Sequence, residues 1–220
     1  MLFFLASILH LASLQGAWTR LEIFTKPLIV LSLLGYYLLN APFWSVIFIL
    51  ALVFCCLGDS LLLFQYGNEM FFMLGLGSFL VAHIFFILSY RQHCLIQSGA
   101  IAMGTQKVRL AFPVVLAGMG LITVLLPSLG PLKIPVMMYA LVLTLMVVSA
   151  IFRLGRTSAI SFWMVLSGAL LFMVSDSVLA INKFLNPVAH ASLWIMITYS
   201  AALFLIVEGI RRHALVDGNR

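Results

Sequence analysis

The amino-acid sequence consists of long apolar runs joined by short polar connections. Of its 220 residues, 64% are hydrophobic and only 8% are charged, whereas an ordinary soluble domain has about 25% charged residues. A helix needs about 20 apolar residues to cross the hydrocarbon core of a bilayer, and runs of this kind take up nearly the whole chain. The sequence therefore predicts one integral membrane domain over residues 1–220, surrounded by the lipid bilayer.

The apolar runs predict an all-α fold, a bundle of eight transmembrane helices. Backbone N–H and C=O groups in lipid must be paired within the segment, and no run shows the alternation of a membrane β-barrel. Pro27 falls in the first turn of the second predicted helix, where its missing N–H is harmless. The predicted helices cover residues 2–18, 25–40, 43–65, 70–90, 108–127, 132–152, 158–182 and 189–211.

The distribution of basic residues predicts the orientation in the membrane. Eight spans put both termini on one side, which holds Arg91, Lys107, Arg109, Arg153, Arg156, Arg211, Arg212 and Arg220, against Arg20, Lys26, Lys133 and Lys183 on the other. The positive-inside rule places the richer side in the cytoplasm. For a bacterial source this means the inner (plasma) membrane, with both termini cytoplasmic. The net charge of +6 comes from residues scattered over helix ends, so no nucleic-acid partner is expected, and no feature indicates an oligomeric state.

Two aspartates interrupt the apolar runs. Asp59 lies in the third predicted helix and Asp176 in the seventh, and each is followed by a serine. A carboxylate at membrane depth costs about 2.5–3.5 kcal/mol on insertion scales, so such a residue is by default a functional-site candidate. Each lies about six residues before the predicted end of its helix, roughly 9 Å inside the non-cytoplasmic boundary. This matching depth predicts that the two acids belong to one site.

Other polar residues are expected in the same half of the bundle. Lys26 enters from that side at the start of the second helix, His83 lies near the middle of the fourth, and Asn182 closes the seventh. Tyr199, in the middle of the eighth helix, faces either the acids or lipid. The complete candidate site is Asp59 and Asp176, with Lys26, His83, Ser60, Ser175, Asn182 and Tyr199 as substrate-binding or supporting residues.

Structural explanations compete with these functional ones. The aspartates could fix helix packing through an ion pair or a hydrogen bond, and Lys26 could extend to the membrane surface. His83 could bond a neighbouring Ser or Tyr inside the bundle. Glu208 has Arg211 and Arg212 at i+3 and i+4, the spacing of an ordinary surface pair.

A metal site is not expected. Zinc would need three converging His, Cys or Asp ligands. His10 and His93 are assigned to the wrong side, and only His83 and His190 could approach Asp59. We therefore predict a protein without a metal or any other cofactor.

Short motifs along the chain resemble a known family. In chain order they are Lys26-Pro27, Leu57-Gly58-Asp59-Ser60, Gly75 to His83 with Phe79 and Ala82, Ser175-Asp176, and Tyr199. Their order and spacing resemble the YhhN-like proteins, the lysoplasmalogenase family. The resemblance implies a membrane hydrolase that cleaves the vinyl ether bond of lysoplasmalogens, releasing a fatty aldehyde and glycerophosphocholine or glycerophosphoethanolamine. Its partner would be this lysophospholipid substrate.

Two intramembrane acids suit that chemistry. An enol ether is hydrolysed by protonation of its β-carbon, addition of water to the oxocarbenium ion and collapse of the hemiacetal. One carboxyl group must be protonated and the other ionised, a division favoured when two carboxyl groups share a buried site. The serines around Asp176 make it the candidate base. Lys26 would anchor the phosphate or fix the ionisation of one aspartate, and His83 would orient Asp59.

Other functions also fit the sequence. A proton-coupled membrane transporter uses paired intramembrane acids as well, although the cytoplasmic half of the predicted bundle is almost wholly apolar, with no visible path through it. A hydrolase of another lysolipid, or a structural membrane protein without chemistry, are the remaining alternatives.

Overall fold

The computed structural model describes residues 2–16, 19–65, 68–94 and 104–217, and all regular structure in these ranges is helical. The all-α prediction is confirmed. Two short 3-10 helices, η2 (Leu126–Ser128) and η3 (Gly130–Leu132), connect α5 to α6. The α-helices are α1 (Leu2–Gly16), α2 (Thr19–Asn40), α3 (Val46–Leu62), α4 (Glu69–Gln92), α5 (Gly104–Leu125), α6 (Lys133–Ile151), α7 (Ala159–Phe184) and α8 (Ala191–Asp217).

Most of these helices have the length and composition of membrane spans. Within the described residues, six helical stretches are long and apolar enough to cross a bilayer, and they contain α2, α4, α5, α6, α7 and α8. The helices α1 and α3 are apolar but have only 15 and 17 residues. The chain is therefore a multi-pass integral membrane protein, and the crossing of all eight helices stays a prediction.

The second helix begins earlier than the sequence predicts. It starts at Thr19 rather than at residue 25, so Pro27 lies inside α2 and not in its first turn. Because proline has no N–H, the carbonyl of Ile23, one turn earlier, loses its helical donor. Membrane helices tolerate such a gap where polar groups lie nearby. The sequence prediction was wrong because the polar residues before Pro27 belong to the helix and not to the connection.

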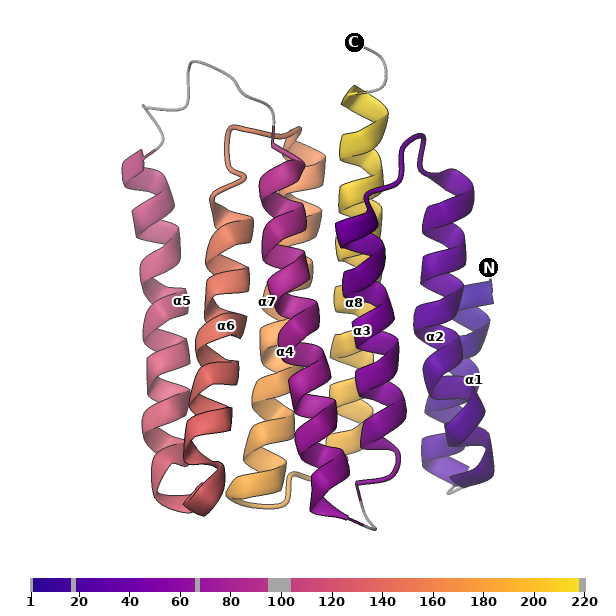
Figure 1. Ribbon diagram of the computed structural model, residues 1–220, viewed down its shortest axis with the longest axis vertical. Helices are drawn as coiled ribbons and strands as arrows, with labels where there is room; N and C mark the ends of the chain where they lie inside the picture. The colour runs from indigo at the N-terminus through magenta and orange to yellow at the C-terminus, as the bar shows by residue number, and fades with distance from the viewer. Residues whose placement is uncertain (1, 17–18, 66–67, 95–103, 218–220) are drawn as a thin grey trace.

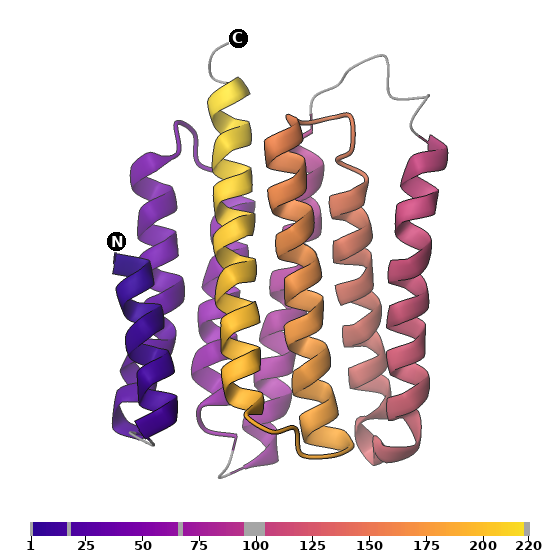
Figure 2. The same cartoon turned by 180° about the vertical axis from the view of Figure 1, so that it is seen from behind.

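Two closely packed helix pairs form the centre of the bundle. The helices α3 and α4 lie on one face, and α7 and α8 lie behind them (Figures 1 and 2). A Cβ atom on Gly168 of α7 would lie 2.7 Å from the carbonyl oxygen of Ala202 on α8. Only a glycine allows the two backbones to approach this closely. The helices α7 and α8 are therefore fixed relative to each other, which positions the residues that they contribute to the site.

The upper end of the bundle in Figure 1 contains a buried cation. Arg153, which follows α6, is fully buried. Its Nη2 atom donates to the hydroxyl of Ser161 at 3.0 Å, and that hydroxyl donates to the carbonyl of Gly209 at 2.7 Å. This end corresponds to the predicted cytoplasmic half, so the expectation that this half is almost wholly apolar was wrong.

Glu208, predicted to form a surface ion pair, lies largely buried between two helices. Its side chain is only 7% exposed and accepts hydrogen bonds from Arg211 at 2.8 Å and from Arg212 at 2.7 Å. It also accepts from the hydroxyl of Tyr36 on α2 at 2.9 Å. The contacts of Glu208 are therefore more than an ordinary surface ion pair, because its largely buried carboxylate joins α8 to α2.

Candidate active site

A cavity of about 450 Å³ lies where α3 and α7 end and where α2 and α8 begin, at the lower end of the bundle in Figure 1. Both intramembrane aspartates line it. The apolar residues that line it are Leu14, Ile23, Leu62, Leu63, Phe79, Leu179, Ile195 and Met196. The polar residues that line it are His10, Glu22, Lys26, Asp59, Gln65, Ser175, Asp176, Asn182, Lys183, Ser192 and Tyr199.

Asp59 has two partners from distant helices. It is only 2% exposed. The hydroxyl of Tyr199 on α8 donates to its Oδ2 atom at 2.7 Å, and the Nζ atom of Lys26 on α2 lies 3.7 Å from its Oδ1 atom. The cavity thus holds Asp59 next to a positive charge and a hydroxyl donor. Lys26 thus lies within ion-pair distance of an aspartate, and both roles predicted for it stay predictions.

Asp176 has different surroundings. The hydroxyl of Tyr139 on α6 donates to its Oδ2 atom, and the Nε2 atom of His83 lies 4.0 Å from the same oxygen. Among the described residues, no Lys or Arg nitrogen lies within 4.0 Å of Asp176. Sequence reasoning missed Tyr139, although it is a tyrosine inside an apolar run just as Tyr199 is. This shared pattern could have identified Tyr139 as a candidate from the sequence.

The two acids are not equally distant from the ends of their helices. Asp59 is three residues from Leu62, the last residue of α3, and Asp176 is eight residues from Phe184, the last residue of α7. The expectation of about six residues for each was therefore wrong. Both still line one cavity, because α7 extends farther than α3 toward that end (Figure 1).

The serines next to Asp176 do not hold its carboxylate. Ser175 donates to the carbonyl of Ile195 on α8 at 3.1 Å, and Ser177 donates to the carbonyl of Met173 at 2.7 Å. Each hydroxyl proton is therefore used by the backbone. The argument that these serines make Asp176 the base loses its support.

Asn182 lies in the cavity wall and stabilises the connection that follows α7. Its Oδ1 atom accepts from the backbone N–H of Val188 at 3.0 Å. This contact joins the end of α7 to the loop that leads into α8. The predicted site residue is thus present at the cavity, with its carbonyl oxygen engaged by the protein.

Two predicted residues do not line the cavity. Ser60 donates to the carbonyl of Cys56 at 2.8 Å and faces a separate apolar groove between α3 and α4. One residue step turns an α-helix by about 100°, so Ser60 cannot share the face of Asp59. His83 is fully buried against the rings of Tyr139 and Phe172, with centroids 5.4 and 4.8 Å away. It approaches Asp176 and not Asp59, so the expectation that it orients Asp59 is not met.

His10 lines the cavity, although the sequence predicted that it lies toward the cytoplasmic side, away from the aspartates. Its Nδ1 atom is 2.8 Å from the hydroxyl oxygen of Thr25, and Thr25 donates its own proton to the carbonyl of Leu21. The helix α1 starts about halfway up the bundle (Figure 1). Its middle residues therefore lie closer to the cavity than they would if α1 crossed the whole membrane. The imidazole is therefore an additional polar group of the site.

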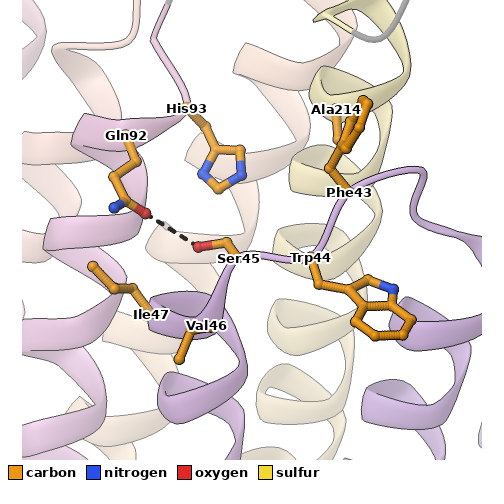
Figure 3. Close-up of a pocket in the computed structure, with 8 residues that line it drawn as sticks. All are labelled: Phe43, Trp44, Ser45, Val46, Ile47, Gln92, His93 and Ala214. Carbon is orange, nitrogen blue, oxygen red and sulfur yellow. Dashed lines mark hydrogen bonds between the residues drawn. The ribbon is translucent and has the colours of Figure 1, made fainter.

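A second cavity of about 440 Å³ lies at the opposite end of the bundle, between α3, α4 and α8 (Figure 3). In it, the hydroxyl of Ser45 donates a hydrogen bond to Gln92 at 3.1 Å. Its lining residues, Phe43, Trp44, Ser45, Val46, Ile47, Gln92, His93 and Ala214, include no carboxylate. It does not supply a pair of acids, unlike the cavity around Asp59 and Asp176.

Within residues 2–16, 19–65, 68–94 and 104–217, no group of three or more His, Cys, Asp or Glu side chains could hold a metal ion. The prediction of a metal-free site stays a prediction.

The fold and the site define a multi-pass membrane protein with two aspartates, one buried and one partly exposed, and a lysine in one cavity. The chain belongs to the YhhN family, whose model matches residues 21–210. It is 33% identical to the human protein named Lysoplasmalogenase TMEM86A over 211 residues, 90% of this chain and 81% of that protein. It is 32% identical to human Lysoplasmalogenase TMEM86B over 184 residues, 82% of this chain and 71% of that protein.

A bacterial relative extends this comparison. The chain is 34% identical to a Mycobacterium tuberculosis protein named Lysoplasmalogenase over 163 residues, 72% of this chain and 58% of that protein. No solved structure gives a significant match. The relatives from human and bacterial sources are thus all named lysoplasmalogenases.

Proposed function

We propose that this protein is a lysoplasmalogenase, a membrane hydrolase that cleaves the vinyl ether bond of lysoplasmalogens. The products would be a fatty aldehyde and glycerophosphocholine or glycerophosphoethanolamine. The names of its relatives support this proposal. The observation that carries it is the pair of aspartates in one cavity, each hydrogen-bonded to a tyrosine of a neighbouring helix.

The cavity suits a single-chain amphiphile. Its volume of about 450 Å³ lies within the usual range for small-molecule sites, about 300–1,000 Å³. We propose that the alkenyl chain lies against the apolar residues that line the cavity, among them Phe79, Leu179 and Met196. The head group would lie toward the end of the bundle, where the charged residues are. The vinyl ether would then be held between the two carboxyl groups.

The charges around the acids suggest which one carries the proton. Lys26 places a positive charge 3.7 Å from Asp59, and a nearby opposite charge favours the ionised form of a carboxyl group. Among the residues that the structure describes, Asp176 has no Lys or Arg nitrogen within 4.0 Å. Tyr139 donates to only one of its oxygens, Oδ2, which leaves Oδ1 for a proton. We therefore assign Asp59 as the carboxylate and Asp176 as the acid, the reverse of the assignment from sequence.

The first steps form and trap the cation. Asp176 gives its proton to the β-carbon of the vinyl ether, and the π electrons form the new C–H bond. The resulting oxocarbenium ion is stabilised by the carboxylate of Asp59. Water then adds to the α-carbon and loses a proton to Asp59, which gives a neutral hemiacetal. General acid–base groups of this kind contribute about 10²–10⁴-fold each.

The last step restores both acids. Asp59 returns its proton to the glycerol oxygen as the C–O bond breaks, and Asp176 accepts the proton of the hemiacetal hydroxyl. The aldehyde and the glycerophospholipid head leave, with one water consumed. Asp59 is again ionised and Asp176 again protonated, so the cycle needs no further proton donor.

A direct assay tests the proposal. Purified protein is incubated with a lysoplasmalogen, with its saturated ether analogue and with an ester lysolipid, and the aldehyde and the free head group are measured. We expect aldehyde from the vinyl ether only. Release of fatty acid from the ester would favour the hydrolase of another lysolipid. Uptake of the lipid into vesicles without aldehyde would favour the transporter.

A further inference from the structure

The cavity contains two charged side chains that the proposed chemistry does not use. Glu22 lies in the first turn of α2 and Lys183 in the last turn of α7, and both line the cavity. Lys26 and Asp59 are already paired at 3.7 Å. In the part of the chain that the structure describes, neither Glu22 nor Lys183 has an oppositely charged group within 4.0 Å.

Lys183 is held at the end of the cavity by its surroundings. Its Nζ atom lies 5.0 Å from the centroid of the Phe72 ring, a cation–π contact. The neighbouring Asn182 is fixed by its hydrogen bond with the Val188 N–H at 3.0 Å. Lys183 is an exposed residue, and a lysine ammonium has three N–H donors that an anionic group can accept from.

Glu22 has a second acceptor beside it in the sequence. The next residue, Ile23, also lines the cavity, and its carbonyl has no helical donor because Pro27 lacks an N–H. A carboxylate attracts an ammonium, and a carbonyl without its regular helical donor adds partial negative charge beside it. This wall of the cavity is therefore suited to a cation, and the wall of α7 is suited to an anion.

We propose, on the basis of the function proposed above, that Lys183 and Glu22 recognise the two charges of a zwitterionic phospholipid head group. Lys183 binds the phosphate, for which a lysine ammonium is a common point-charge ligand. Glu22 binds the ammonium of ethanolamine or choline. The two residues make the site selective for head groups that carry both charges.

A structural explanation makes a different prediction. An acidic residue in the first turn and a basic residue in the last turn also complement the helix dipole. In that case, substitutions would change thermal stability slightly and would affect every ligand equally. Glu69 provides a matched control, because it lies in the first turn of α4, is exposed and does not line the cavity.

The test uses probes that cannot be cleaved, so it does not depend on catalysis. The ligands are saturated ether lysolipids with phosphocholine, phosphoethanolamine or phosphate head groups, and the third has no cation. We measure their Kd values with the full-length protein in detergent, for the wild type, Glu22→Gln, Lys183→Gln and Glu69→Gln. Glu22→Asp and Lys183→Arg test rescue by the same charge.

We expect a pattern that depends on the head group. Glu22→Gln raises the Kd of the two zwitterionic probes about fivefold, the size expected for a partly exposed charge contact, and leaves that of the phosphate probe unchanged or lower. Lys183→Gln raises all three Kd values by a similar factor, and Glu69→Gln changes none. Glu22→Asp keeps the negative charge, so it is expected to keep the wild-type difference in Kd between the zwitterionic probes and the phosphate probe. It provides this comparison if Glu22→Gln does not fold.

Two outcomes overturn the inference. One is an equal change for all three probes in Glu22→Gln, and the other is unchanged binding in both Glu22→Gln and Lys183→Gln. A protein that binds the probes in the expected pattern but releases no aldehyde from a lysoplasmalogen refutes the proposed function alone.

Discussion

Replacing Asp59 and Asp176 by asparagine, singly and together, tests whether the two carboxyl groups act as one catalytic unit. Asparagine keeps the size of the side chain and can still accept a hydrogen bond from Tyr199 or Tyr139, but it cannot transfer a proton. We expect each single variant to fold, to bind a saturated ether lysolipid and to lose most of its turnover.

The magnitude follows from the shared cavity. Each acid–base group contributes about 10²–10⁴-fold, so independent groups would lose about 10⁴–10⁸-fold in the double variant. In the proposed cycle, Asp176 regains a proton from the hemiacetal hydroxyl only as Asp59 protonates the glycerol oxygen, so the two acids act in the same step. The double variant is therefore expected to be little slower than either single one, because residues that act as a unit are strongly non-additive.

The structure also predicts a difference in stability between the two variants. Asp59→Asn leaves Lys26, whose side chain is 15% exposed, without its partner 3.7 Å away. Removing one member of a buried pair costs up to about 3–5 kcal/mol, and contact with the cavity should keep the cost below that. Asp176→Asn removes no such pair, so its Tm should fall less.

Kinetics and binding are measured on the same preparations. Turnover is followed by aldehyde release, binding by the Kd of the saturated analogue, and folding by Tm and gel filtration. Glu69→Gln, outside the cavity, serves as the control. Near-normal turnover of either single variant, or losses that multiply in the double variant, would refute the two-carboxylate mechanism.

Four further predictions concern the tyrosines, the helix packing, the orientation and the metal. Tyr139→Phe and Tyr199→Phe each remove a hydroxyl that donates to an aspartate, so turnover should fall by about tenfold or more at unchanged Kd; normal turnover in both would remove the tyrosines from the mechanism. Gly168→Ala should lower the Tm by several degrees because its Cβ meets backbone at 2.7 Å, whereas Gly77→Ala, with nothing within 4 Å, should not; equal Tm values would contradict the close packing. A reporter fused after Arg220 should give a cytoplasmic signal, and a periplasmic or lumenal one would reverse the predicted orientation. Activity should survive dialysis against strong chelators, and a loss that zinc restores would contradict the metal-free prediction.

The sequence predicted the helical architecture well, because membrane spans are determined by length and apolar composition. It also identified Asp59, Asp176 and Lys26, since a charged group within or at the end of an apolar run is costly and conspicuous. The boundaries were less predictable. Pro27 was placed at the start of a helix, whereas α2 continues through it, and the position of a helix end decides the depth of every residue counted from it.

Side-chain direction accounts for most of the errors at the site. Ser60 follows Asp59 directly, but the helical turn of about 100° per residue directs it to another groove. The serines next to Asp176 bond to the backbone, as Ser and Thr in helices commonly do. Neighbours in the sequence are therefore poor guides to partners within a membrane helix.

The partners of the two acids instead come from helices that are distant in the sequence. Tyr199 on α8 bonds Asp59 on α3, and Tyr139 on α6 bonds Asp176 on α7. These two contacts are similar, so they do not distinguish the acids. Lys26 does, because it approaches only Asp59. The proposed division of roles thus depends on one cation from α2, and this is why the motifs around the aspartates led to the opposite assignment.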